Sequence, residues 1–178
     1  SVPKNSNDFS TCVKILEGGR GSNWLNSLKI EDKIEFMGPN GNLAFRTQQS
    51  KTAIFIATGT GVTPFKSIIE NELAKGNKNT MHLIFGLRYI KDIFYKDYFE
   101  KLAEKYKNFT FEITLSRPED DTWKGKVGRV TDILNKMPID TRSTEFYICG
   151  LKDMVNEMAT ILKTKGVPKN AINMEKYD

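Results

Sequence analysis

Short apolar runs recur along the chain from about residue 52 onward, and helix signals separate them. The runs are short enough for buried strands, and they lie at 52–58, 81–87, 109–115, 146–149 and 171–177. Helices are predicted between them at 63–75, 95–106, 130–136 and 152–165. This alternation predicts an α/β fold, in which a doubly wound, mostly parallel sheet carries helices on both faces.

The first helix has a clear start and a clear end. Thr63 can cap its open amides, and Pro64 suits its first position because proline has no amide hydrogen to lose. Gly76 ends the helix. Ligands on parallel sheets bind beyond the carboxyl ends of the strands, so the start of this helix is a place to look for chemistry.

The pattern in residues 1–47 differs, because it predicts short strands and turns with no helices between them. Residues 9–16 and 34–36 resemble strands, and a turn is expected at 38–41. This stretch has too few apolar residues to close a core of its own. We therefore divide the chain into a first part, 1–47, and an α/β domain, 48–178.

Composition narrows the function classes. Hydrophobic residues make up 39% of the chain, so a core can form. No apolar run is long enough to cross a membrane and the N-terminus has no apolar signal core, so a cytoplasmic protein is expected. The net charge is +5, and the basic residues are scattered among acidic ones along the chain. A solvated surface, or attraction to anionic ligands or acidic partners, is favoured over nucleic-acid binding.

Cysteine and histidine are too scarce for several kinds of chemistry. Cys12 and Cys149 are the two cysteines, and His82 is the single histidine. Two cysteines alone cannot ligate an iron–sulfur cluster, and one imidazole excludes a metal site that needs several. We expect no metal.

A glycine-rich turn follows the first strand of the α/β domain. The turn comprises Gly59, Thr60, Gly61, Thr63 and Pro64. Its glycines let the backbone come close to a diphosphate, and the helix behind it directs amides at an anion. It is neither the Rossmann nor the Walker pattern, and a plain tight turn remains an alternative.

Two later strand exits carry polar or reactive residues. Ser116 and Arg117 can hold a phosphate through a hydroxyl and a guanidinium, although a solvent-facing arginine is an equal alternative. Cys149 precedes Gly150 at the end of another strand, where a cysteine alone is more often core filling.

Together these segments resemble the ferredoxin–NADP reductase family over nearly the whole chain. The resemblance includes five segments. The first two are the turn at 58–64 and the strand exit that ends at Arg88. The others are Ser116 and Arg117 together with residues 123–132, which include Lys126; then Cys149, Gly150 and Met154; and finally Glu175 and Tyr177. It implies a flavoprotein that passes a hydride between NAD(P)H and FAD. Electrons then go to an acceptor protein such as ferredoxin or flavodoxin.

The resemblance also implies roles for these residues. The 59–64 turn would hold the diphosphate of NADP or NAD, and Ser116 and Arg117 the adenosine end, where Arg117 favours NADP. Cys149 and Gly150 would border the nicotinamide. Tyr177 would cover the flavin ring, and Glu175 would polarise or relay a proton.

Residues 1–47 would then be the end of an antiparallel, FAD-binding β-barrel. Gly19, Gly21 and Ser22 are similar to the family's Gly-x-x-Ser, which meets the flavin diphosphate. The family's Arg-x-Tyr-Ser motif is absent, so we expect this barrel to be incomplete. An NADH-specific reductase component of an oxygenase remains an alternative, as does a non-catalytic NAD(P)-binding electron-transfer subunit.

Overall fold

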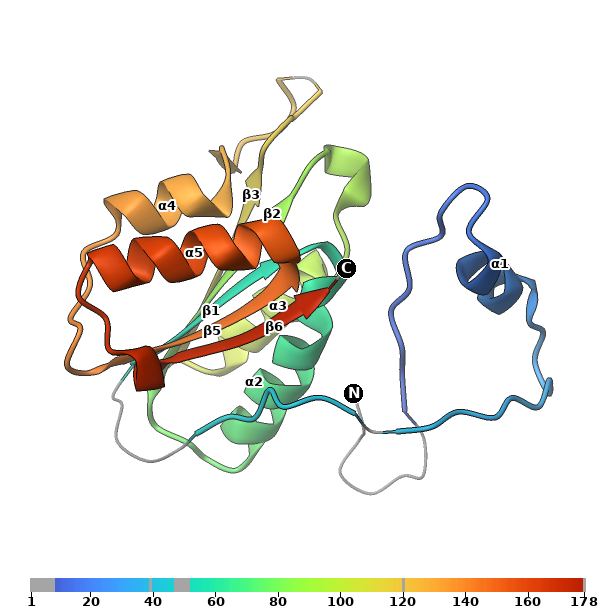
Figure 1. The fold of residues 1–178 in the computed structure, drawn as a ribbon, viewed down its shortest axis with the longest axis horizontal. Helices are drawn as coiled ribbons and strands as arrows, with labels where there is room; N and C mark the ends of the chain where they lie inside the picture. Colours follow the sequence, from blue (N-terminus) through green and yellow to red (C-terminus); the bar gives the residue numbers. More distant parts are fainter. Residues whose placement is uncertain (1–8, 39, 47–51, 120, 178) are drawn as a thin grey trace.

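The computed structural model describes residues 9–38, 40–46, 52–119 and 121–177 (Figure 1). These residues form one six-stranded sheet in the order β4-β3-β2-β1-β5-β6, in which every neighbouring pair is parallel. The strands are β1 (Thr52–Thr58), β2 (Thr80–Leu87), β3 (Phe109–Leu115), β4 (Lys126–Val127), β5 (Thr144–Leu151) and β6 (Ile172–Tyr177).

Helices cover both faces of the sheet (Figure 1). One core packs α2 (Thr63–Ala74) and α3 (Lys96–Lys105) against the sheet, and the other packs α4 (Val130–Lys136) and α5 (Lys152–Thr164). The remaining described helices are α1 (Arg20–Ser27) and the 3₁₀ turns η1 (Gly59–Val62), η2 (Ile90–Asp92) and η3 (Lys169–Ala171). None of the described helices is long and apolar enough to cross a membrane.

The strand order reverses between β1 and β5. From β1 the chain builds β2, β3 and β4 outward on one side, and then returns to add β5 and β6 on the other side. A crevice opens at such a switch point, outside the carboxyl ends of the two central strands. The predicted glycine-rich turn follows β1 at this point.

The α/β fold and the parallel sheet predicted from the sequence are confirmed. The expected cap at Thr63 is wrong. Because η1 runs directly into α2, Val62 already has helical backbone angles at the capping position. The Thr63 hydroxyl instead donates to the carbonyl oxygen of Thr60, at 2.7 Å.

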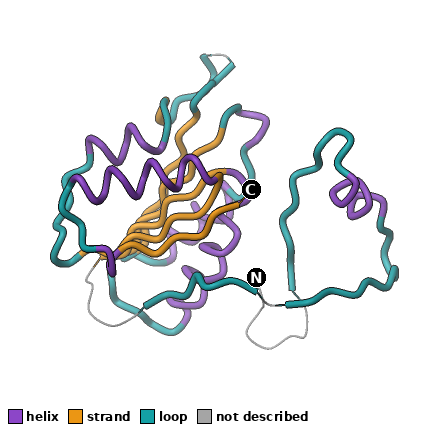
Figure 2. Tube along the Cα trace, in the orientation of Figure 1, coloured by secondary structure: helices purple, strands orange, loops and turns teal. Residues whose placement is uncertain are grey.

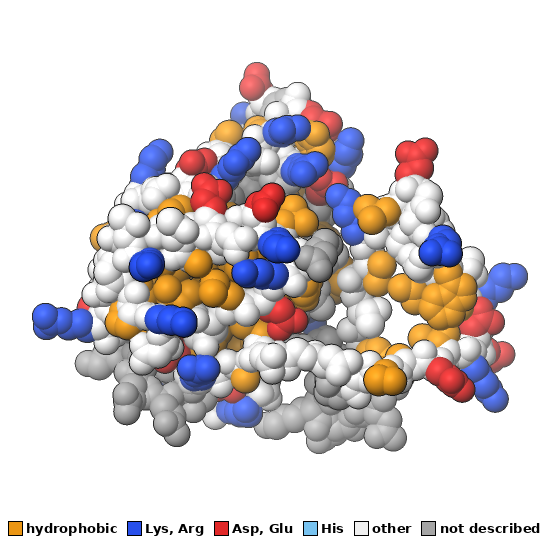
Figure 3. All heavy atoms as spheres, in the orientation of Figure 1, with side chains coloured by type: hydrophobic (Ala, Val, Ile, Leu, Met, Phe, Trp, Pro, Cys, Tyr) orange, Lys and Arg blue, Asp and Glu red, His pale blue; other side chains and the backbone are white. Residues whose placement is uncertain are grey.

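The strands expected at 9–16 and 34–36 are not formed, and α1 is the only regular element within residues 9–38 and 40–46. A strand exists only when it pairs. These segments form no ladder in the described structure, although the ring centroids of Phe9 and Phe36 lie 4.5 Å apart. Their apolar side chains stay exposed, as the hydrophobic atoms around the α1 region show (Figure 3). The predicted turn at 38–41 includes Pro39, which lies outside the described residues, as do the domain boundary at 47–48 and residues 1–8.

Residues 40–46 are held against the sheet by Tyr147. The ring of Phe45 lies 5.3 Å from that of Tyr147 and 6.0 Å from that of Phe55, measured between centroids. The Tyr147 hydroxyl accepts a hydrogen bond from the Arg46 amide at 3.0 Å and donates to a Glu145 carboxylate oxygen at 2.5 Å. Burial and the bond to Glu145 both raise the pKa of Tyr147, so the phenol keeps the proton that it donates. This side chain therefore ties the segment before β1 to β5.

We expect Tyr147→Phe to lower the free energy of unfolding by roughly 1–3 kcal/mol, because the Arg46 amide and Glu145 both lose their partner. Urea denaturation of both chains measures the difference. Tyr106→Phe is the matched control, since the Tyr106 hydroxyl has no hydrogen bond within the described structure. Equal stability of wild type and Tyr147→Phe would contradict the anchoring role.

Candidate nucleotide-binding site

The turn after β1 packs directly on the backbone of β5. Gly61 lies in η1 and is buried. A Cβ atom at Gly61 would overlap the Cys149 carbonyl oxygen and lie 2.8 Å from the Gly150 nitrogen. Because these are backbone atoms of a central strand, they cannot move aside. Only glycine therefore allows the turn to lie this close to β5.

Gly150 makes a second close approach, from β5 toward β1. A Cβ atom there would overlap the Thr58 hydroxyl and lie 2.7 Å from the methyl carbon of Met154. The Thr58 hydroxyl is buried and has no hydrogen-bond partner among the described residues. Buried polar groups are normally paired, so an unpaired hydroxyl at a switch point is suited to a ligand.

The start of α2 is open to an anion. No side chain caps η1 or α2. Gly59 has a φ of +54°, a left-handed conformation that glycine adopts without strain and that turns the chain out of β1. The turn thus combines close backbone approach with an uncapped helix start, which suits a diphosphate.

Cys149 lies beneath Tyr177 on the α2 face of the sheet. Cys149 pairs with Glu175 in the register between β5 and β6, and its side chain is fully buried. Burial raises the pKa of the thiol to about 11, although a hydrogen bond with Tyr177 opposes this rise. The sulfur is therefore a neutral thiol at physiological pH, which suits a packing surface rather than a nucleophile.

A cavity of about 480 Å³ lies beside Tyr177, between the start of α2, the end of β6 and residues 40–43. Gly41 forms part of its wall, with a φ of +121°, and a Cβ atom there would lie 3.2 Å from both carboxylate oxygens of Glu175. The lining residues are Asn40, Gly41, Leu43, Thr63, Pro64, Ser67, Glu175 and Tyr177. The segment before β1 thus contributes a wall that sequence reasoning had not assigned to the site.

The exits of β2 and β3 extend this edge. The Ser116 amide donates to the Leu87 carbonyl oxygen at 3.0 Å, and the Arg117 amide donates to that of Arg88 at 2.9 Å. The side chains of Arg88 and Arg117 are both exposed. Two guanidinium groups on neighbouring strand exits can therefore reach an anion above the sheet.

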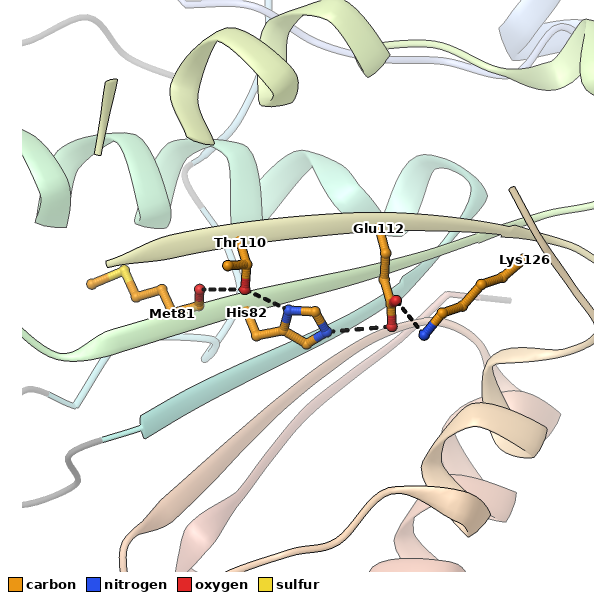
Figure 4. A network of polar contacts seen from close by, with 5 residues as sticks. All are labelled: Met81, His82, Thr110, Glu112 and Lys126. Carbon is orange, nitrogen blue, oxygen red and sulfur yellow. Dashed lines mark hydrogen bonds and ion pairs between the residues drawn. The ribbon is translucent and has the colours of Figure 1, made fainter. Parts of the chain in front are cut away.

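Lys126, by contrast, is directed away from this exit. It lies in β4 at the edge of the sheet, and its ammonium contacts Glu112 on β3 (Figure 4). His82 on β2 contacts the other oxygen of the same carboxylate. Sequence reasoning missed this network because neither Glu112 nor β4 gave a recognisable signal.

Gly19, Gly21 and Ser22 lie apart from the sheet edge, in and before α1 (Figures 1 and 2). The Ser22 hydroxyl donates to the Gly19 carbonyl oxygen at 3.2 Å and accepts from the Leu16 amide at 3.1 Å. From the residues alone a loop is expected here, but Arg20–Ser27 is helical. No side chain caps α1, so its first turn is open to an anion, as a flavin diphosphate would require.

No group of three or more histidine, cysteine, aspartate or glutamate side chains in the described ranges could hold a metal ion.

Two family models match the chain. Residues 55–160 match the oxidoreductase NAD-binding domain, and residues 1–45 match the oxidoreductase FAD-binding domain. Ferredoxin–NADP reductase B of Sorangium cellulosum is 32% identical over 185 aligned positions, which cover 100% of this chain and 75% of that protein. The chain belongs to the ferredoxin–NADP reductase family. The predicted resemblance is thereby confirmed.

Other proteins that this chain is similar to are longer relative to it. The reductase component of propane 2-monooxygenase from Rhodococcus jostii is 29% identical, and the alignment covers 93% of this chain and 46% of that protein. Among solved structures, the cytochrome P450 reductase of Amycolatopsis has the same fold, with a TM-score of 0.82 at 24% identity over 92% of this chain and 50% of that one. The chain thus spans about half the length of these two relatives.

The contact between Gly61 and β5 predicts the effect of a small substitution. Gly61→Ala should lower the free energy of unfolding by roughly 1–3 kcal/mol, because the added methyl group must displace the backbone of Cys149. Gly21→Ala is the control, since nothing lies within 4 Å of a Cβ atom at Gly21. Thermal and urea unfolding of both variants test this, and a stable Gly61→Ala protein would show that the turn can shift away from β5.

Proposed function

We propose that this chain binds a nicotinamide dinucleotide at the switch point between β1 and β5, and that a hydride passes there between the nucleotide and FAD. The observation that carries the proposal is the contact of Gly61 with the backbone of β5, beside the unpaired hydroxyl of Thr58. Electrons would then leave to an acceptor protein such as ferredoxin or flavodoxin. The name of the Sorangium relative supports this assignment.

We further propose that the two parts of the chain divide this work. Residues 1–47 would belong to an FAD-binding barrel, and residues 48–178 would form the NAD(P)-binding domain. The separate matches of 1–45 and 55–160 to FAD-binding and NAD-binding domains support the division. Gly19, Gly21 and Ser22 would face the flavin diphosphate through the uncapped start of α1.

The nucleotide would lie across the carboxyl edge of the sheet. Its diphosphate would sit on the turn formed by Gly59, Thr60, Gly61, Thr63 and Pro64, with Thr58 supplying a hydroxyl. Its adenosine end would reach Ser116 and Arg117, with Arg88 nearby on the next strand exit. An arginine at this position can pair with the 2′-phosphate of NADP, so NADP is preferred to NAD.

The nicotinamide end would lie over Cys149 and Gly150. Flavin and nicotinamide supply the redox chemistry, and the protein holds them in place. Gly150 has no side chain, so β5 packs directly against Thr58 and Met154, and no Cβ atom would stand between the nicotinamide and the backbone. Tyr177 covers Cys149 and has to leave before a ring can reach the thiol. Glu175 faces the adjoining cavity, where its carboxylate can hold or pass on a proton.

A second candidate is the reductase component of an oxygenase. The Rhodococcus relative, named as the reductase component of propane 2-monooxygenase, favours it. The nucleotide site would be the same, and the electron acceptor would be an oxygenase component instead of ferredoxin or flavodoxin. Reduction of purified ferredoxin and flavodoxin by the FAD-loaded protein separates the two candidates.

Calorimetric titration with NADP and with NAD tests the nucleotide site. We expect both to bind, and Arg117→Ala to weaken NADP binding by roughly ten- to a hundredfold, because a charge-assisted contact contributes about 1.5–3 kcal/mol. NAD affinity should stay nearly unchanged, because NAD has no 2′-phosphate. Arg142→Ala is the control, because Arg142 is an exposed arginine just before β5, at the amino ends of the strands and away from the site. Equal weakening of both nucleotides would make Arg117 a general anchor and exclude the NADP preference.

Stopped-flow reduction of FAD tests the role of Cys149. With FAD and NADPH supplied to the chain, Cys149→Ala should slow flavin reduction by about tenfold or more, equivalent to ~1.4 kcal/mol of barrier, because the thiol forms the surface against which the nicotinamide is placed. NADP affinity should change much less. A folded Cys149→Ala protein that reduces flavin at the wild-type rate would leave Cys149 with a packing role alone.

A further inference from the structure

Lys126 occupies a position from which its side chain can reach either of two places. It pairs with Thr114 in the register between β3 and β4. Glu112 lies two residues before Thr114 and Ser116 two residues after it. Strand spacings place Lys126 at a similar distance, about 8 Å between Cα atoms, from both. Side chains two residues apart in a strand share a face, so Lys126 and Glu112 point to the same side, and Ser116 follows directly after the last residue of β3.

In the structure the lysine points to Glu112, away from the strand exit. Its ammonium nitrogen lies 2.5 Å from Oε2 of Glu112, and Nε2 of His82 lies 3.3 Å from Oε1 (Figure 4). The other ring nitrogen of His82 lies 2.7 Å from the Thr110 hydroxyl, which fixes the imidazole. The carboxylate is therefore held on both oxygens, with its side chain only 18% exposed.

The charge state of Glu112 supports a firm hold on Lys126. The hydrogen bond from His82 lowers the pKa of this carboxyl, and the bond from Lys126 lowers it further, although burial opposes both. Glu112 is thus ionised at neutral pH. The lysine side chain is 55% exposed and has a flexible stem, so removing the carboxylate leaves its ammonium free to turn.

We propose that Glu112 is a specificity-determining residue, which limits the affinity for a 2′-phosphorylated nucleotide by holding Lys126 away from Ser116 and Arg117. The inference rests on the proposed function, because it places the adenosine ribose at the exit of β3. In the wild-type chain Arg117 meets the 2′-phosphate without help from Lys126. Glu112 thus sets how strongly the site prefers NADP to NAD.

Glu112→Gln in the full chain tests this inference. The change keeps the shape of the side chain and removes its charge. NADP should bind roughly three- to tenfold more tightly, because Lys126 would gain an ionic contact with the 2′-phosphate. Such a contact of an exposed lysine contributes about 1 kcal/mol to the binding free energy. NAD affinity should change by less than about twofold. Calorimetry with each nucleotide measures both affinities.

Two further variants isolate the lysine. In the double variant Glu112→Gln with Lys126→Met the gain in NADP affinity should vanish, since the group that makes the new contact is gone. Glu100→Gln on α3 removes the same charge from another lysine–glutamate pair and should leave both affinities unchanged. Amine-labelling of the chain without nucleotide, read by mass spectrometry, should show faster modification of Lys126 in Glu112→Gln.

The outcomes separate this inference from the proposed function. If NADP and NAD both bind but Glu112→Gln leaves their affinity ratio unchanged, the inference is wrong and the nucleotide site stands. A gain that survives in the double variant also overturns it, because Lys126 is then not the responsible group. If neither nucleotide binds the wild-type chain, the proposed function fails and this inference fails with it.

Discussion

The close contact between the Gly61 turn and the backbone of β5 is the constraint on which the site depends. It brings the exit of β1 against the exit of β5, the two strands between which the order of the sheet reverses. Any side chain at Gly61 would push the turn away from β5. Thr58 and Gly150 also face each other here, and the Thr58 hydroxyl has no hydrogen-bond partner among the described residues. The tight backbone contact and the unpaired Thr58 hydroxyl therefore occur together at the place where a nucleotide would lie.

The central elements could be predicted from sequence because their apolar runs match their burial. The predicted strands 52–58 and 109–115 coincide with β1 and β3, and the boundaries of the main helices differ by a residue or two. Burial on both faces makes such runs continuous and easy to recognise. The two-residue β4 has no such run, and it exists only because Lys126 and Val127 lie beside β3. The strands predicted at 9–16 and 34–36 are not formed, because an apolar segment becomes a strand only when a partner strand pairs with it.

For the site as well, features set by the local sequence could be predicted, and features set by contacts between distant segments could not. The turn and the strand exits could be predicted because parallel strands bring their carboxyl ends to one edge, whatever the details of packing. The unpaired hydroxyl of Thr58, the cavity wall at Gly41 and the hold of Glu112 on Lys126 could not. Each depends on two segments that are far apart in sequence and meet only in the folded chain. Thr63 fails for a related reason, since the adjacent 3₁₀ turn, and not the residue type, decides whether a cap is needed.

The pairing of β1 with β5 also has a kinetic consequence. β1 and β2 are close in sequence, but β5 follows only after β2, β3, β4 and their helices. Joining β5 to β1 closes a long loop. The chain loses the entropy of that loop before the new contacts between the strands form and stabilise the pair. We therefore expect the switch-point crevice to form late in folding, after the β1–β2–β3 half is in place. A nascent chain that has not yet produced β5 holds the glycine-rich turn but has no surface against which to close it.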